Sequence, residues 1–83
     1  LKTEDADLSN TNFQGAILNE ATLLHCNFNE AKLAEIQFRL ASLTLCSFTN
    51  SSLENSDFSN SILTDCMFTN ANLEGANLSG AHL

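Results

Sequence analysis

From Leu8 to the last residue, every fifth position of this chain holds leucine or phenylalanine. A step of five residues turns a side chain by about 140° around an α-helix, and it moves the side chain to the opposite face of a β-strand. Neither regular element would therefore keep these large residues on one side, and the chain must coil with a repeat of its own. The positions are Leu8, Phe13, Leu18, Leu23, Phe28, Leu33, Phe38, Leu43, Phe48, Leu53, Phe58, Leu63, Phe68, Leu73, Leu78 and Leu83.

A second series lies two residues before each of these positions and is made of small side chains, with Ile36 as the exception. Small residues suit a crowded inward position beside a large core residue. The other three positions of each five-residue unit, or pentad, are mostly Asn, Ser, Thr, Asp and Glu, which favour turns and tolerate exposure. A repeat with two residues inward and three outward predicts a solenoid, in which stacked coils bury a continuous core.

The cysteines indicate how many pentads make one coil. Cys26, Cys46 and Cys66 are separated by intervals of four pentads, all at the small inward position. A coil of two pentads would predict cysteine at two further positions, which hold Ile36 and Ser56. Four pentads per coil is therefore the better period.

This period arranges the large residues in four columns around a narrow square interior. Phe28, Phe48 and Phe68 form one column, and Phe38 and Phe58 form the column opposite. Alternating broad and slim columns would fill such an interior without voids. The two leucine columns are Leu23, Leu43, Leu63 and Leu83, and Leu33, Leu53 and Leu73.

The triplets "ADL" at 6–8 and "ANL" at 71–73 and 76–78 match an A(D/N)LXX signature, so the chain resembles the pentapeptide repeat family. The resemblance implies an all-β fold, a right-handed quadrilateral β-helix (a pentapeptide repeat solenoid) with one pentad on each side and about four coils, each of four pentads. We expect a repeat domain over residues 6–83 and an N-terminal flank over residues 1–5.

Charge narrows the classes of partner. The 10 acidic and 3 basic residues give a net charge of −7. This negative charge repels nucleic-acid phosphates and anionic membrane surfaces, so direct binding to either is opposed. The same charge attracts basic partners. No apolar run approaches the roughly eighteen residues of a membrane span, so we expect no membrane insertion.

The cysteine column does not predict a metal site or a disulfide. Zinc requires four converging ligands, whereas side chains stacked about 4.8 Å apart run parallel. Parallel Cβ vectors also fit a disulfide poorly. We expect three buried, reduced, space-filling thiols, a state that suits a reducing compartment such as the cytoplasm.

No catalytic or cofactor site is expected. The columns bring no Ser, His and carboxylate within hydrogen-bond reach, and His25 and His82 lie about three coils apart. Gly15, Gly75 and Gly80 end their pentads, where a corner needs a permissive φ, and form no phosphate-binding loop. The chain is therefore predicted not to be an enzyme.

Two surfaces are candidate interaction sites. An acidic strip contains Glu35, Glu54 and Glu74, which lie on one side of the predicted coil. Such a strip is either a solvated side that discourages self-association or a docking strip for a basic partner.

The second candidate is an apolar patch in which Leu24, Leu45 and Ile62 point outward from one side, with Leu40 at the corner that enters it. Thr22, Thr44 and Thr64 rim the patch. A cluster of exposed apolar residues can mark a partner surface.

Two functions follow. The first is a non-enzymatic structural or protein-interaction module, part of a larger protein, with a protein partner whose identity these residues do not specify. The ends of the coil lack a visible cap, so we expect a continuing solenoid, a covering domain or end-to-end self-association. The alternative comes from the resemblance, because some pentapeptide repeat proteins bind DNA gyrase, a topoisomerase, as acidic mimics of duplex DNA.

Overall fold

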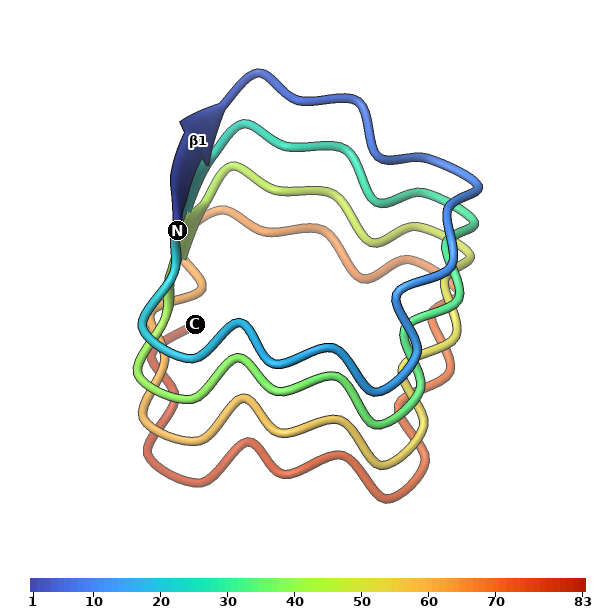
Figure 1. The fold of residues 1–83 in the computed structure, drawn as a ribbon. Helices are drawn as coiled ribbons and strands as arrows, with labels where there is room; N and C mark the ends of the chain where they lie inside the picture. Colours follow the sequence, from blue (N-terminus) through green and yellow to red (C-terminus); the bar gives the residue numbers. More distant parts are fainter.

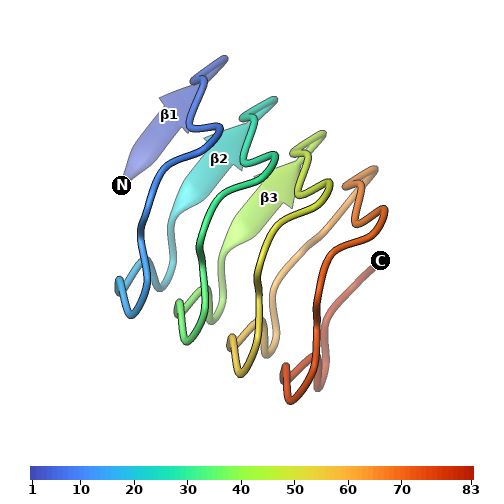
Figure 2. The same ribbon diagram turned by 90° about the vertical axis from the view of Figure 1, so that its right-hand side faces the viewer.

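The computed structural model describes all 83 residues, Leu1–Leu83, and has no helix. Three short strands form one parallel sheet in the order β1 (Lys2–Glu4), β2 (Thr22–Leu24) and β3 (Ser42–Thr44). Thr3 pairs with Leu23, and Leu23 pairs with Leu43, so each strand is shifted by four pentads from the next. Figure 1 and Figure 2 show the strands stacked in successive coils. The predicted right-handed quadrilateral β-helix is confirmed.

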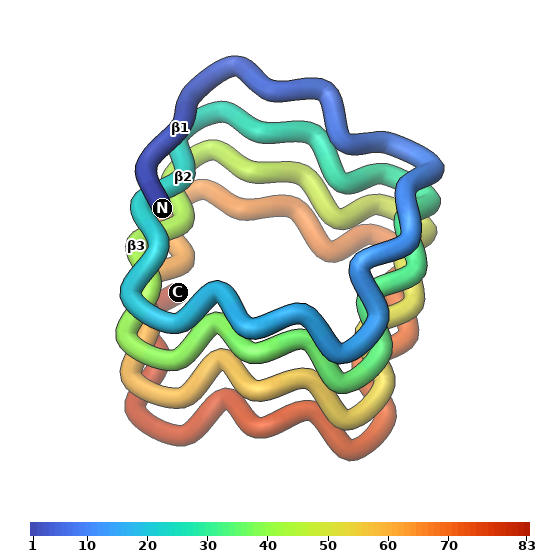
Figure 3. Tube along the Cα trace, viewed as in Figure 1, coloured from blue at the N-terminus to red at the C-terminus, as the bar shows by residue number.

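The same shift of four pentads joins the coils on the remaining sides, as in the bridges from Asp7 to Asn27 and from Asn12 to Lys32. Figure 3 shows the four-sided path of the chain. We number the sides in chain order, each defined by the pentads that it contains. Side 1 contains residues 1–5, 21–25, 41–45, 61–65 and 81–83; side 2 contains 6–10, 26–30, 46–50 and 66–70; side 3 contains 11–15, 31–35, 51–55 and 71–75; side 4 contains 16–20, 36–40, 56–60 and 76–80.

Residues 1–5, expected as a flank, contain β1 and lie on side 1 of the first coil. Thr3 stands where the following coils have Leu23 and Leu43, and it is half-buried. The Leu/Phe pattern does not include this pentad because its central residue is threonine. Threonine is β-branched and therefore suits a strand.

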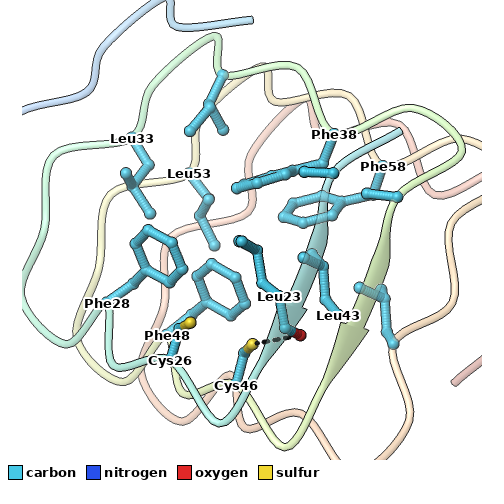
Figure 4. Close-up of a cluster of buried hydrophobic side chains, with 14 of the residues drawn as sticks. Leu23, Cys26, Phe28, Leu33, Phe38, Leu43, Cys46, Phe48, Leu53 and Phe58 are labelled. Carbon is cyan, nitrogen blue, oxygen red and sulfur yellow. Dashed lines mark hydrogen bonds between the residues drawn. The ribbon is translucent and has the colours of Figure 1, made fainter. Parts of the chain in front are cut away.

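The core consists of the predicted columns, shown in Figure 4. The rings of Phe48 and Phe68 are stacked with centroids 5.1 Å apart, and those of Phe38 and Phe58 are 5.4 Å apart. Across the interior, Phe38 meets Phe48 edge-on at 6.2 Å. Ile36, the one large residue in the small series, is fully buried. Stacked and T-shaped contacts are both favourable aromatic geometries, so the two phenylalanine columns fill the interior together.

The corners have a backbone conformation that ordinary residues avoid. The last residue of each complete pentad has a positive φ, including Gly15 at 75° and Asn50 at 59°. Glycine and asparagine adopt this left-handed conformation readily, whereas other L-residues are strained in it. Leu40 and Leu45 nevertheless occupy corners, with φ of 58° and 57°.

Outward polar residues in several pentads hold the turn before the corner. The Asp57 carboxylate accepts a hydrogen bond from the Ser59 backbone N–H at 2.9 Å, and the Asn77 side chain does the same for Ser79 at 3.0 Å. These local bonds provide a partner for an amide near the turn. The Asp or Asn of the repeat therefore has a structural role.

The stack has extents of 27 × 26 × 21 Å and no long axis. At its N-terminal end an apolar cavity of about 250 Å³ opens over the core, lined in part by Leu8, Phe13 and Leu18. The chain has no helix that is long and apolar enough to cross a membrane.

Candidate interaction surface

The four residues of the predicted apolar patch are exposed, with 38% of Leu24, 55% of Leu40, 50% of Leu45 and 43% of Ile62 accessible. They do not form one continuous cluster. Leu24 and Leu45 lie at the edge of side 1 next to side 2, whereas Leu40 and Ile62 lie at the edge next to side 4. A strip of Ser and Thr separates the two pairs, because Leu24 is paired with Thr44 and Ile62 with Ser42.

A groove of about 700 Å³ follows the corner between sides 1 and 2, where residues directly after β1, β2 and β3 line it. We call it the corner groove. It crosses all four coils, from Asp5 in the first to Asp65 and Met67 in the fourth, with Leu45 between them. Its lining residues are Asp5, Ala6, Asp7, His25, Cys26, Asn27, Asn29, Leu45, Cys46, Ser47, Asp65 and Met67.

Met67 was not among the predicted patch residues, although 55% of its side chain is exposed. The sequence marks it, because it stands where this family usually has Asp or Asn. Met67 and Leu45 belong to different sides and meet in the groove because the groove is formed where sides 1 and 2 join.

The corner groove is acidic. Three aspartates line it, and neither lysine nor arginine does. Nδ1 of His25 lies 2.8 Å from Oδ1 of Asp5, one coil away at the same corner. Hydrogen bonds from the Ser9 hydroxyl and backbone N–H lower the pKa of the Asp7 carboxyl below its ordinary value. Asp7 is therefore an anion at neutral pH.

Two of the cysteines lie at the base of the groove. Cys26 and Cys46 are buried and Cys66 is half-buried, and all three are free thiols. The expectation of three buried thiols is wrong for Cys66, which lies in the fourth coil and is covered on one side by the third. The Cys46 thiol donates to the Leu23 carbonyl oxygen, shown as a dashed line in Figure 4.

Contact with the Cys66 thiol, together with burial, raises the pKa of Cys46 strongly, and the same contact lowers the pKa of Cys66. Burial raises the pKa of Cys26. No group of three His, Cys, Asp or Glu side chains is arranged to hold a metal ion.

The acidic strip lies on side 3, away from the groove. Glu54 and Glu74 are one coil apart, because the backbone N–H of Asn55, next to Glu54, donates a hydrogen bond to the Glu74 carbonyl oxygen. Glu35 lies at the adjoining corner, where its backbone N–H donates to the Glu54 carbonyl oxygen. One carboxylate oxygen of Glu54 is buried without a hydrogen-bond partner. Lys32 lies on the same side, so the strip is not uniformly negative.

Comparison with known proteins gives a single family. A family model described as a pentapeptide repeat region matches residues 21–83. A search of curated protein sequences found no significant match.

Three solved structures illustrate the likeness. HetL, a pentapeptide repeat protein involved in heterocyst differentiation regulation in the cyanobacterium Nostoc sp. strain PCC 7120, is 27% identical with a TM-score of 0.96, over 99% of this chain and 38% of HetL. A pentapeptide repeat protein from the Arabidopsis thaliana thylakoid lumen is 34% identical with a TM-score of 0.67, over 92% of this chain and 60% of that protein.

Trypsin-treated QnrB1 carrying M102R, a plasmid-mediated fluoroquinolone resistance protein, is 22% identical with a TM-score of 0.81, over 90% of this chain and 37% of QnrB1. At this identity the likeness concerns the fold alone. The chain spans less than two thirds of the length of each of these three proteins.

Proposed function

The chain belongs to the pentapeptide repeat family, and we propose that it is a non-enzymatic protein-interaction module that binds a protein partner through side 1 and its corners. The proposal rests on one observation: Leu40 and Leu45 are exposed apolar residues, and both have a left-handed backbone conformation. These corners bound side 1 at its two edges.

Leucine is unfavourable at these two corners for two independent reasons. Its Cβ is crowded at positive φ, and its side chain leaves apolar surface in water. Asparagine occupies corners 50, 55, 60 and 70 of the same fold. Residues that break local rules of stability are often found at functional sites, which supports a partner on side 1.

The polar residues support a binding role over a catalytic one. A catalytic site needs a nucleophile or base oriented by neighbouring groups in a concave pocket. Here Asp57 and Asn77 hold local turns, and the thiols of Cys26 and Cys46 are buried in the stack. These four side chains therefore contribute to the fold.

Acidic mimicry of duplex DNA, with a topoisomerase as partner, is the second candidate. The net charge of −7 supports it. The extents of 27 × 26 × 21 Å weigh against it, because duplex DNA is an extended rod with charge distributed along its axis.

The test is affinity capture from a bacterial lysate with the purified chain, quantified by mass spectrometry. A side 1 variant, Leu24→Ser, Leu45→Ser and Ile62→Ser, is compared with two controls of unchanged β-sheet signal. One control is Ile17→Ser, which removes an exposed apolar residue from side 4. The other is Glu35→Gln, Glu54→Gln and Glu74→Gln, which neutralises the acidic strip.

We expect a partner that both controls retain and that the side 1 variant loses. Capture of a topoisomerase that survives the side 1 substitutions and is lost at high salt would instead establish mimicry. Partners lost only with the acidic-strip variant would place the working surface on side 3.

A further inference from the structure

We propose that the corner groove binds an extended segment of the partner that carries a basic side chain at each end and an apolar side chain between them. This inference rests on the proposed function and names the chemistry of the partner. It concerns a groove in which exposed apolar residues and three aspartates occur together.

The length of the groove sets the spacing of the ligand. Asp5 lies in the first coil and Asp65 in the fourth, which is three coil spacings of about 4.8 Å, or about 14 Å. An extended chain rises about 3.3 Å per residue, so residues 1 and 5 of a segment are about 13 Å apart. Side chains 1, 3 and 5 of such a segment point to the same face. A five-residue segment therefore presents three side chains to the groove.

Charge at the two ends selects basic residues. Asp5 and Asp7 lie at the N-terminal end and Asp65 at the other, with no lysine or arginine in the lining. His25 is the only lining residue that can become a cation, and it is bonded to Asp5. Arginine would match the carboxylates because its planar guanidinium can donate two parallel hydrogen bonds.

Apolar contact selects the central residue. Leu45 is half exposed and lies between the acidic ends, in the third coil with Cys46 beside it, and Met67, also half exposed, lies in the fourth coil. Methionine adapts its shape to different apolar ligands. Leu45 would lose its exposed apolar surface on binding, and this gives a reason for leucine at a strained corner.

The test uses a synthetic peptide, acetyl-Arg-Ser-Leu-Ser-Arg-amide, titrated into the ¹⁵N-labelled chain. Amide chemical shifts give the dissociation constant and the location of binding. We expect the largest shifts at the groove residues of sides 1 and 2. A peptide with Gln in place of both Arg should bind at least fivefold more weakly, and one with Ser in place of Leu about threefold more weakly.

Two variants of the protein separate the groove from the overall field of the molecule. Asp5→Asn, Asp7→Asn and Asp65→Asn remove the groove charge, and asparagine suits both the corners and the Ser9 turn. Glu20→Gln, Glu30→Gln and Glu74→Gln remove the same charge outside the groove. The first variant should weaken peptide binding at least fivefold and the second less than twofold.

Equal weakening by the two variants would overturn the proposal, because the attraction would then come from net charge alone. Shifts centred on side 3, equal binding of the Gln peptide, or no binding at millimolar peptide would also overturn it. In each of these cases the capture experiment could still show a partner on side 1, so failure of the partner chemistry is distinguishable from failure of the proposed function.

Discussion

The rings of Phe28 and Phe48 lie parallel within 2°, one coil apart, with their centroids separated by 5.0 Å. Phe48 also stacks on Phe68, so it is the central ring of its column and is fully buried. Phe48→Ala would leave a cavity that the coiled backbone cannot close, and it should reduce the free energy of unfolding by about 3–5 kcal/mol. Denaturant unfolding followed by circular dichroism measures this loss.

The matched control is Phe68→Ala at the end of the same column. Phe68 is half-buried, so its removal should cost clearly less than the removal of Phe48. Equal costs at the two positions would contradict the column as the unit of packing.

Replacement of Leu45 should make the fold more stable. Leu45 has a φ of 57°, and Leu45→Asn places a residue that tolerates this conformation at an exposed corner. We expect a gain of roughly 0.5–1 kcal/mol in the free energy of unfolding, together with weaker peptide binding. Thermal unfolding measures the first effect, and a lower melting temperature would show that Leu45 stabilises the coil.

The thiols should react with iodoacetamide in a definite order. Cys66 is half-buried and its pKa is lowered by the Cys46 thiol, whereas the pKa of Cys46 is raised. Because the thiolate is the reactive form, Cys66 should be labelled first and Cys26 and Cys46 only after denaturation. Mass spectrometry of peptides from the folded chain gives the order, and rapid labelling of Cys46 would contradict its inward placement.

Alkaline pH should destabilise the fold through the same thiols. The pKa of Cys26 and the pKa of Cys46 are both raised in the folded chain above the unfolded value near 9.0. At these two sites the folded state therefore binds more protons than the unfolded state above pH 9, which lowers stability as the pH rises, whereas the lowered pKa of Cys66 acts in the opposite direction. Cys26→Ala, with a residue common at this position of the repeat, removes a thiol whose pKa is raised by burial, and it should lose less stability between pH 8 and about pH 10.5 than the unsubstituted chain.

Asp57 should stabilise the fold mainly through its hydrogen bond. Partial desolvation opposes its ionisation, yet hydrogen bonds from Ser59 and the charge of Arg39, 3.9 Å away, lower the pKa of the Asp57 carboxyl. Asp57→Ala should cost about 0.5–1.5 kcal/mol, whereas Asp57→Asn keeps an acceptor for the Ser59 N–H and should cost less. Urea unfolding compares them, and equal losses would assign the effect to charge.

Most of the fold could be predicted because one spacing rule governs the whole chain. The four-pentad interval between Cys26, Cys46 and Cys66 set the length of the coil, and the columns of phenylalanine and leucine followed from it. The first pentad was not predicted as part of the coil because Thr3, at its centre, is neither Leu nor Phe. In the structure Thr3 of β1 pairs with Leu23 of β2.

The site was harder to predict because it depends on geometry between pentads. Leu45 and Met67 belong to different sides, and only the turn at the corner brings them to one groove. The strain at Leu40 and Leu45 was not predicted either. Glycine at three corners indicates a positive φ there, but the sequence does not indicate that the other corners have a positive φ as well.

Site-specific photocrosslinking shows which side of the coil contacts the partner. A benzophenone amino acid is placed at Thr44, in the middle of side 1, or at Ser52, in the middle of side 3, and irradiated in the same lysate. We expect one crosslinked partner from Thr44 that is absent from Ser52. A partner crosslinked from Ser52 and not from Thr44 would contradict the account and assign the working surface to the acidic strip.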